Sequence, residues 1–541
     1  MKLSIIKVIN NKFSNQRGEI LEMSLSQYIN HDEPFGPDSA ELFEDDLDAY
    51  RDLFDTHNKL FNRLRNRPSF IIGRKGSGKT TYLNNVLIND DYDVIVSLQT
   101  NKALVRIIEV FQQHSTGLPF AEDIAELWES TLWISIFSKI RNTIKISGDL
   151  KISINAYLSK IGVRDANSID DVFWIVSDVL SENAGDRAVG MVAEILRRLD
   201  KRSFDETRRK CIEFFRENGH RAIILIDSLD DFRLEIDAVV HALQGLIKCV
   251  GSFRHPSGFV DVRFCLPAEL YHVFQDISVN AAKDFRRQLI LHWTAAELII
   301  LGANRLNKYL NLYFPDEVPK TLAKTISNKS DAIELFNLIF PHQIYNGLGT
   351  PENSVSYILR HTQLLPRQFL KMLNSIANLN RANSGNILKI TEKDILTGVA
   401  KEEEILVFEV FDAFKFVHPK ARQVCERCIP ELPVIFSLGD LQRVFRTHGK
   451  IAMETDDFFK FKTMLIEVGI IGRVIMEEET DRYHKGLFEY TVPNRLVTAT
   501  NDMFCVHPMF SRVFVSSRNR VDAKPIYPYG ANLDDTDYRQ F

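Results

Sequence analysis

The chain has 541 residues, 45% of them hydrophobic and 26% charged, with a formal net charge of -5 and a pI of about 6.3. This composition is ordinary for a globular protein, and the length predicts roughly three or four domains whose cores need no disulfides. The weak negative charge excludes a global basic field that would draw the chain to nucleic acid.

Residues 1–60 are predicted to form a polar, acidic segment. Eight carboxylates crowd its second half, between Asp38 and Asp55. A solvated helix face or loop explains such a run more simply than a partner-binding arm does. The amino-terminal apolar run is too short for a secretory signal, and no stretch approaches the roughly 18 uncharged apolar residues of a membrane span. Together with six sparse cysteines, this favours a cytoplasmic protein.

From about residue 65, short apolar strands alternate with helices. Such alternation is typical of a parallel sheet covered by helices on both faces. We therefore expect an α/β domain over 61–292, with a long helical insertion over about 102–218. The predicted strands are Ser69–Ile72, Asp93–Leu98, Ala222–Ile226, Val260–Leu266 and Gln288–His292, and a helix is expected over Lys79–Ile88.

The composition changes at Trp293, and helices follow. Thr294 and Glu297 form a capping-box pattern that opens a helix from Ala295 to about Leu312. More helices are expected to about residue 405. Residues 293–405 are therefore predicted to form a helical lid.

The last region, 406–515, has a different order of elements. Ser437 caps one helix, a second helix runs over about Asp456–Val468, and two strands separated by a polar turn follow. Helix, helix, strand, turn, strand is the order of a winged-helix domain, which we expect here. Residues 516–541 are assigned to a tail.

The most specific pattern is the run Gly73-Arg-Lys-Gly-Ser-Gly-Lys-Thr80, which fits G-x-x-x-x-G-K-[ST]. In such a loop, glycines let backbone N–H groups cradle phosphate oxygens, the lysine reaches the β- and γ-phosphates, and the hydroxyl binds Mg²⁺. The run lies between a predicted strand and a predicted helix, whose amino terminus favours the same anion. The alternative is a glycine-rich turn that binds nothing. The residues assigned to a nucleotide site are Gly73, Arg74, Lys75, Gly76, Ser77, Gly78, Lys79, Thr80 and Thr81, with Thr80 also a magnesium ligand.

A cluster of carboxylates follows the strand Ala222–Ile226. Asp227 ends that strand, so its side chain is expected at the carboxyl edge of the sheet, where open α/β sheets bind ligands. We assign Asp227 to the Mg²⁺ shell and either Asp230 or Asp231 to the base that orients the attacking water. A capping cluster at a strand-to-helix turn is the simpler alternative. Because Ser228 stands where many ATPases place a glutamate, we expect slow, switch-like hydrolysis rather than the turnover of a motor.

Together these two motifs resemble the STAND branch of P-loop NTPases, which shares its core and lid with the AAA+ group. More narrowly, they are similar to bacterial STAND-like ATPases with a G-R-K-G-[ST]-G-K loop. Val262–Glu269 resembles the sensor strand of that group and its exit, and Leu289–Trp293 its strand-to-lid junction. The resemblance covers roughly residues 65–400. It implies a nucleotide switch that couples ATP binding to oligomerisation or signalling, with relatives common in bacterial defence against phage.

Three arginines are candidates for contacting nucleotide, with ordinary surface charge as the alternative for each. Leu365-Pro-Arg367 resembles the sensor arginine of the lid, and Pro366 suits the first position of a helix, so Arg367 could lean over a γ-phosphate. Arg286 and Arg287 precede the last core strand and are candidate fingers acting on a neighbouring subunit.

Two weaker patterns concern the last region. Cys425 and Cys428 have metal-ligand spacing, and Cys505 with His507 could complete a zinc site, but a single C-x-x-C favours reduced, partly buried cysteines. Positive residues for DNA binding are present, but the second helix opens with two aspartates that would face phosphates. The basic residues in question are Arg443, Arg446, Lys450, Lys460 and Lys462.

The sequence therefore predicts an ATPase that uses ATP and Mg²⁺, binds them between core and lid, assembles into a homo-oligomer and signals to an effector protein. One alternative is a DNA-binding AAA+-like loader that grips phosphates with its winged helix. Another is a scaffold that holds nucleotide without hydrolysing it.

Overall fold

In the computed structural model the chain divides into two units. The core unit comprises Lys59–Lys75 and Lys79–Leu291. The carboxyl unit comprises His292–Phe541, the described part of Met1–Asn58, and three loop residues, Gly76–Gly78. None of the helices that the structure describes has the length and hydrophobicity needed to cross a lipid bilayer. The structure describes residues 25–39, 42, 46, 49, 52–54, 59–64, 66–84, 89–98, 121–146, 148–162, 200–227, 237–253, 258–278, 280–318, 325–347, 349–385, 387–476, 482–491, 495–516, 519 and 524–533.

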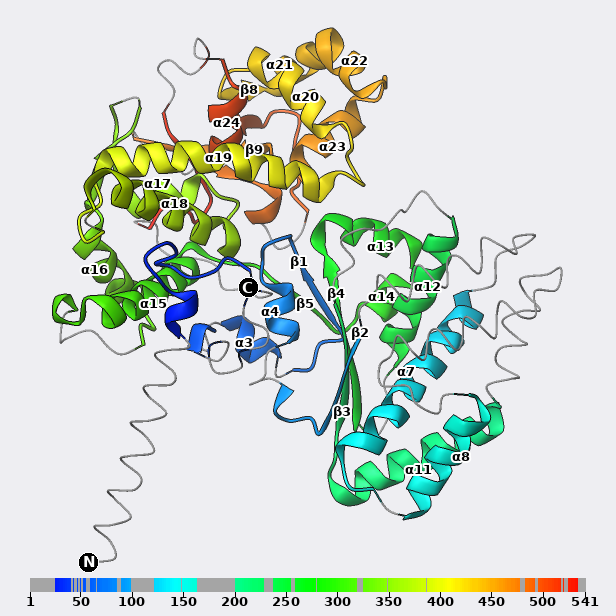
Figure 1. The fold of residues 1–541 in the computed structure, drawn as a ribbon. Helices are drawn as coiled ribbons and strands as arrows, with labels where there is room; N and C mark the ends of the chain where they lie inside the picture. The colour runs from blue at the N-terminus through cyan, green and yellow to red at the C-terminus, as the bar shows by residue number, and fades with distance from the viewer. Residues whose placement is uncertain are drawn as a thin grey trace, which may run out of the picture. The chain divides into compact units, whose positions relative to one another are not determined.

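The core unit is built on a five-stranded sheet in the order β2-β3-β4-β1-β5, and every pairing in it is parallel (Figure 1). The register sets Ile226 beside Phe264 and Gly73 beside Pro267. The carboxyl ends of β1, β3 and β4 therefore meet at one edge of the sheet. The strands are β1 (Phe70–Gly73), β2 (Val94–Leu98), β3 (Ala222–Ile226), β4 (Val260–Pro267) and β5 (Gln288–Ile290).

The predicted parallel sheet is confirmed, with strand ends that shift by one or two residues. All residues of β1 and β3 are buried, as expected for strands covered on both faces. By contrast, β5 alternates exposed, buried, exposed, because it lies at the edge of the sheet. Its exposed Ile290 shows that this edge is only partly covered among the described residues.

Helices lie on both faces of this sheet. On one face α4 (Lys79–Leu83) packs on β1 and β4, and on the other face α7 (Ala121–Thr143) and α12 (Asp237–Ser252) pack together against the sheet (Figure 1). The indole of Trp128 in α7 donates to the carbonyl of Ala242 in α12 at 3.2 Å, which fixes the two helices against each other. Residues 85–88 of the helix predicted after the loop lie outside the described residues.

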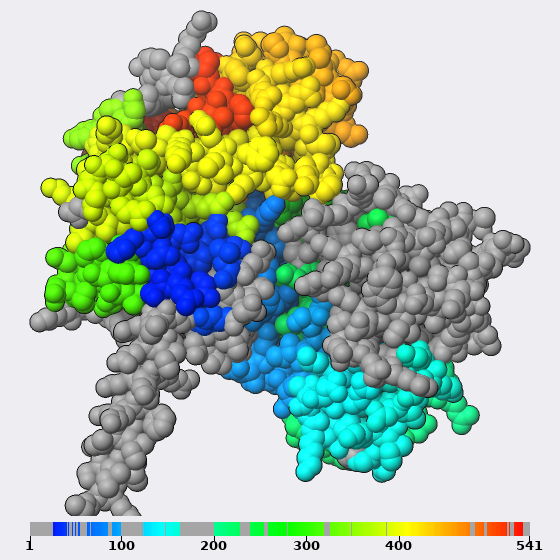
Figure 2. Space-filling model, in the orientation of Figure 1, coloured from blue at the N-terminus to red at the C-terminus, as the bar shows by residue number. Residues whose placement is uncertain are grey.

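The described parts of the predicted insertion are helical. Besides α7 they form α8 (Gly148–Lys160) and α11 (Lys201–Asn218), which pack together, and α11 leads directly into β3. Figure 2 shows α7 and α8 as one cyan surface with the green of α11 at its margin. The other helices that the structure describes in the core unit are α3 (Lys59–Leu64), α13 (Tyr271–Ile277) and α14 (Ala281–Asp284).

The carboxyl unit begins with the predicted helices. The capping box of Thr294 and Glu297 is present, and the helix it opens ends at Tyr313. The last helix of this group, α19 (Glu392–Phe414), continues past residue 405, where the lid was predicted to end. It therefore belongs to both the predicted lid, 293–405, and the predicted region 406–515. The helices are α15 (Ala295–Tyr313), α16 (Lys329–Ile339), α17 (Ser354–Arg360), α18 (Pro366–Ser384) and α19 (Glu392–Phe414), with a small hairpin of β6 (Gln343–Tyr345) and β7 (Pro351–Asn353) before α17.

The winged-helix order predicted after the lid is confirmed. Helices α20 (Ala421–Cys428), α21 (Leu438–Val444), α22 (Lys450–Met453) and α23 (Phe458–Glu467) precede an antiparallel pair of strands, β9 (Ile471–Val474) and β10 (His484–Leu487). Ser437 caps α21 as expected. The sheet is wider than predicted, with the order β12-β10-β9-β11-β8. Its other members are β8 (Ile435–Ser437), β11 (Met503–Val506) and β12 (Ile526–Pro528), and α24 (Pro508–Phe514) follows β11.

The prediction of a tail is wrong for β12. Ile526 and Tyr527 are each only 3% exposed, and the strand pairs in parallel with β10. The run is three residues long and ends in proline, so it carries too little periodicity to be recognised. Burial of its side chains against α17 supplies the order that the local sequence does not.

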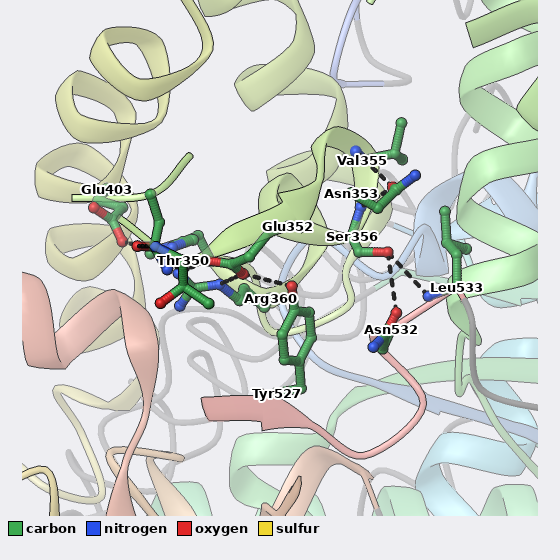
Figure 3. Close-up of polar contacts among 12 residues, drawn as sticks. Thr350, Glu352, Asn353, Val355, Ser356, Arg360, Glu403, Tyr527, Asn532 and Leu533 are labelled. Atoms are coloured by element: carbon green, nitrogen blue, oxygen red, sulfur yellow. Dashed lines mark hydrogen bonds and ion pairs between the residues drawn. The ribbon is translucent and has the colours of Figure 1, made fainter. Parts of the chain in front are cut away.

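A buried polar junction joins the lid helices to this sheet (Figure 3). The guanidinium of Arg360 donates to both oxygens of Glu352, at 2.7 and 3.0 Å, and the hydroxyl of Tyr527 donates to the same carboxylate. The Ser356 hydroxyl also accepts from the Leu533 N–H at 3.0 Å. Since these residues come from β7, α17 and the segment around β12, the lid and the winged-helix region form one packed body.

Candidate active site

The loop Gly73–Thr80 joins β1 to α4, the setting that a phosphate-binding loop requires. Gly76 and Gly78 have φ angles of 85° and 91°, which side chains of L-residues rarely adopt. A Cβ on Gly76 would also lie 3.0 Å from the Cβ of Arg367. Both glycines are therefore needed for the backbone to turn as it does, and successive turned N–H groups make an anion-binding concavity.

The lysine of the loop is buried, with 7% of its surface exposed. Its ammonium donates to the carbonyl oxygens of Gly73 at 3.0 Å and Arg74 at 3.3 Å. Within the described residues the Lys79 ammonium contacts carbonyl oxygens and no carboxylate, and a buried ammonium without a counter-charge is costly. The arrangement fits an anion such as a phosphate as the missing partner. The hydroxyl of Ser77 in the same loop is fully buried and has no hydrogen-bond partner among the described residues.

Two side chains suited to Mg²⁺ lie together at the carboxyl edge of the sheet. The hydroxyl of Thr80 donates to Oδ1 of Asp227 at 3.3 Å. Thr80 follows β1 and Asp227 follows β3, two strands that β4 separates in the sheet. Hard oxygen ligands of this kind are those that Mg²⁺ prefers. The structure thus brings together the two residues assigned to the metal, and Asp230 and Asp231 lie outside the described residues.

A second described carboxylate, Glu269, contacts the loop, and the sequence alone assigns it no role. Its Oε1 accepts the backbone N–H of Lys75 at 2.8 Å. Only 9% of Glu269 is exposed, and its Oε2 is buried with no hydrogen-bond partner among the described residues. The sequence does contain a sign of this contact, because Glu269 is the first carboxylate after β4, as Asp227 is the first after β3. What the sequence could not supply is that β4 lies directly beside β1.

Arg367 lies in the first turn of α18, after Pro366, as predicted from the proline. Its backbone N–H donates to the carbonyl of Gly76 at 3.3 Å. Its guanidinium donates to the Asp38 carbonyl at 3.4 Å and the Ser39 hydroxyl at 3.3 Å. The residue therefore contacts the turn of the loop through its backbone, and a role for its side chain in sensing phosphate stays a prediction.

The two arginines before β5 have different surroundings. Arg287 lies 3.8 Å from Asp261 in a cluster with Arg67 and Arg221, which lie 3.9 and 3.2 Å from the same carboxylate. Asp261 is the second residue of β4, so this cluster lies at the amino edge of the parallel sheet, opposite the edge that carries the loop. Arg286 is exposed. A role for either residue on a neighbouring subunit stays a prediction.

The cysteines of the weak zinc pattern are buried thiols. Cys505 donates to the carbonyl of Gly472, and burial raises the pKa of its thiol to about 12, which disfavours the thiolate that a metal requires. The ring of His507 accepts from the Met509 N–H through Nδ1 and contacts the Tyr490 hydroxyl through Nε2. No group of three potential metal ligands occurs within the part of the chain that the structure describes.

Two of the five basic residues considered for DNA form ion pairs with aspartates, and a third has a neutral partner. Arg443 pairs with Asp440 at 3.2 Å and Lys450 with Asp456 at 2.8 Å, while the ammonium of Lys462 donates to the Thr498 hydroxyl. Asp457 caps α23 through the N–H groups of its first turn. The two ion pairs offset part of the positive charge on which binding to nucleic acid depends. Contact with nucleic acid stays a prediction that these pairs do not favour.

No family model matches the chain, and no curated protein does. Similar solved structures include a Walker-type ATPase of Pyrococcus abyssi, with 11% identity, a TM-score of 0.36, and coverage of 85% of this chain and 95% of that one. The ORC2 protein of Aeropyrum pernix, solved as ADPNP–ADP complexes, has 11% identity, a TM-score of 0.35, and coverage of 86% and 91%. The ORC1 protein of Aeropyrum pernix, solved in complex with DNA, has 11% identity, a TM-score of 0.32, and coverage of 80% and 89%. Likenesses of this size name neither a substrate nor a partner, so the function rests on the geometry of the loop and its carboxylates.

Proposed function

We propose that this protein binds ATP with Mg²⁺ and hydrolyses it slowly, as a molecular switch. The observation that carries the proposal is the loop itself. It holds a buried ammonium, that of Lys79, without a carboxylate partner among the described residues, and it ends in a threonine that donates to the strand-end carboxylate Asp227. A triphosphate and its metal would supply the charges that these groups lack.

Each residue then has a defined task. The N–H groups from Gly73 to Thr81 cradle the phosphates, and Lys79 turns from the loop carbonyls towards the β- and γ-phosphates. Thr80 and Asp227 hold Mg²⁺, which would neutralise charge that develops on the phosphate oxygens. Arg367 responds to nucleotide through Gly76, whose carbonyl accepts its N–H. Asp230 and Asp231 remain candidates from the sequence for orienting the attacking water.

The same proposal includes coupling of nucleotide state to assembly. Serine at position 228 favours slow turnover, which suits a switch that persists in its ATP state. The resemblance of the motifs to STAND-like ATPases extends the proposal to homo-oligomers that signal to an effector protein in bacterial antiviral defence. Light scattering with and without ATP tests this part, and a particle mass that ATP leaves unchanged would contradict it.

Nucleotide binding is tested by calorimetric titration of ATP in the presence of Mg²⁺. Lys79→Ala should weaken binding at least 100-fold, because it removes the charge that reaches the phosphates. Lys151→Ala is the matched control, since Lys151 is exposed on α8 and should leave affinity unchanged. Retention of wild-type affinity by Lys79→Ala would refute the assignment of the site.

A further inference from the structure

The carboxylate of Glu269 is placed at the loop by strand order. Gly73, the first residue of the loop, lies level with Pro267 in the pairing of β1 with β4. The chain leaves β4 in a short 3₁₀ helix, Ala268–Leu270, which carries Glu269 to the N–H of Lys75. Both the strand pairing and the hydrogen bond lie within the core unit, as do Lys79, Thr80 and Asp227.

The part of the loop that Glu269 contacts is the part beside the lysine ammonium. Nζ of Lys79 lies 3.0 Å from the carbonyl of Gly73 and 3.3 Å from that of Arg74, and Lys75 is the next residue. In a phosphate-binding loop the ammonium marks the β/γ end of the triphosphate. Glu269 is therefore held near the end of the site where the γ-phosphate would react.

The two oxygens of Glu269 are in different states. Oε1 is anchored by the Lys75 N–H at 2.8 Å, while Oε2 is buried and has no hydrogen-bond partner among the described residues. A buried carboxylate oxygen without a hydrogen-bond donor is costly, so this oxygen calls for a polar partner such as a bound water. One anchored oxygen and one free oxygen is the arrangement of a base that a second group orients.

Hydrolysis requires such a carboxylate, and the position where many ATPases carry it is Ser228. We propose that Glu269 is the catalytic residue that holds the attacking water through Oε2, supplied from β4 instead of from the residue after Asp227. The water oxygen bonds to the γ-phosphorus, and the bond from that phosphorus to the β,γ-bridging oxygen breaks. The electron pair leaves with ADP, and the proton of the water passes to Glu269 and then to solvent. This inference rests on the proposed binding of ATP.

The test is Glu269→Gln in the full-length chain. The glutamine oxygen can still accept the Lys75 N–H, so the loop keeps its anchor while the base is lost. Glu217→Gln is the matched control, because Glu217 is exposed at the end of α11. We expect the affinity of Glu269→Gln for ATP to stay within threefold of the wild-type affinity. Its rate of phosphate release should fall to about one-hundredth of the wild-type rate or lower. The wild-type rate of hydrolysis should fall at acid pH, where the base is protonated, and the residual rate of Glu269→Gln should lack that fall. The Glu217→Gln control should keep both the wild-type rate and its dependence on pH.

The outcomes separate this inference from the function on which it rests. Failure of the wild type to bind ATP refutes the proposed function. ATP binding with a wild-type rate and pH profile in Glu269→Gln refutes the role of Glu269 alone. A parallel loss of affinity and rate would show that Glu269 only shapes the loop, which also overturns the proposal. Loss of hydrolysis in Asp230→Ala or Asp231→Ala, with hydrolysis kept in Glu269→Gln, would assign the base to those residues instead.

Discussion

Replacement of Arg360 by methionine should destabilise the carboxyl unit more than any change to an exposed charge of that unit. The guanidinium and the Glu352 carboxylate form a bidentate pair, with side chains only 10% and 3% exposed. Burial disfavours the charge on the guanidinium, but the adjacent carboxylate outweighs burial and raises the pKa of Arg360 above its usual value. Methionine fills similar space and leaves the carboxylate buried without its cation.

The magnitude follows from what remains around Glu352. Loss of one partner of a buried ion pair costs about 3–5 kcal/mol. The Asn346 amide and the Tyr527 hydroxyl still donate to the carboxylate, so we expect the lower end, about 3 kcal/mol. Tyr527→Phe removes a single hydrogen bond to a charged group and should cost about 1.5–3 kcal/mol. Arg422→Met, which breaks an exposed ion pair between side chains one helical turn apart, should cost about 0.3–0.5 kcal/mol.

Urea unfolding followed by circular dichroism measures these differences as shifts of midpoint at constant slope. The predicted order of destabilisation is Arg360→Met, then Tyr527→Phe, then Arg422→Met. The reasoning fails if Arg360→Met costs no more than Arg422→Met, since the pair at the junction would then behave as a solvated surface pair.

Two further predictions concern the phosphate loop. Gly76→Ala should weaken ATP binding at least tenfold, because Gly76 has a φ of 85° and the new Cβ would lie 3.0 Å from the Cβ of Arg367. Gly148→Ala is the control and should bind ATP normally, since its new Cβ would have no atom within 4 Å. Equal affinity of the two variants in calorimetry would contradict the loop geometry. Asp227→Asn should bind ATP as the wild type does in EDTA but gain little affinity when Mg²⁺ is added, and a full gain would remove Asp227 from the metal shell.

Much of the core was predictable because its signals are local. The strand Ala222–Ile226 is apolar throughout and became β3 with the same bounds, and the capping patterns at Thr294 and Ser437 opened the helices expected of them. Gly73–Thr80 also carries its own geometry, since its glycines supply the positive φ angles that the turn needs.

What escaped prediction depends on which strands are neighbours. The hydrogen bond from Lys75 to Glu269 joins residues 194 positions apart and exists because β4 pairs with β1. The strand β12 is likewise held by burial against α17 and pairing with β10, and three residues carry no periodicity of their own. Local propensity reports neither kind of contact, so both had to come from the structure.

The junction also orders events during synthesis of the chain. Glu352 and Tyr527 are separated by 175 residues, and ribosomes add about 5–20 residues per second, so roughly 9–35 seconds pass between them. During that interval β7 emerges with a carboxylate that still lacks the Tyr527 hydroxyl, and α17 emerges with a face that β12 will later cover. The lid cannot reach its final packing until β12 has left the ribosome, and the same strand from another nascent chain would fit the waiting face equally well.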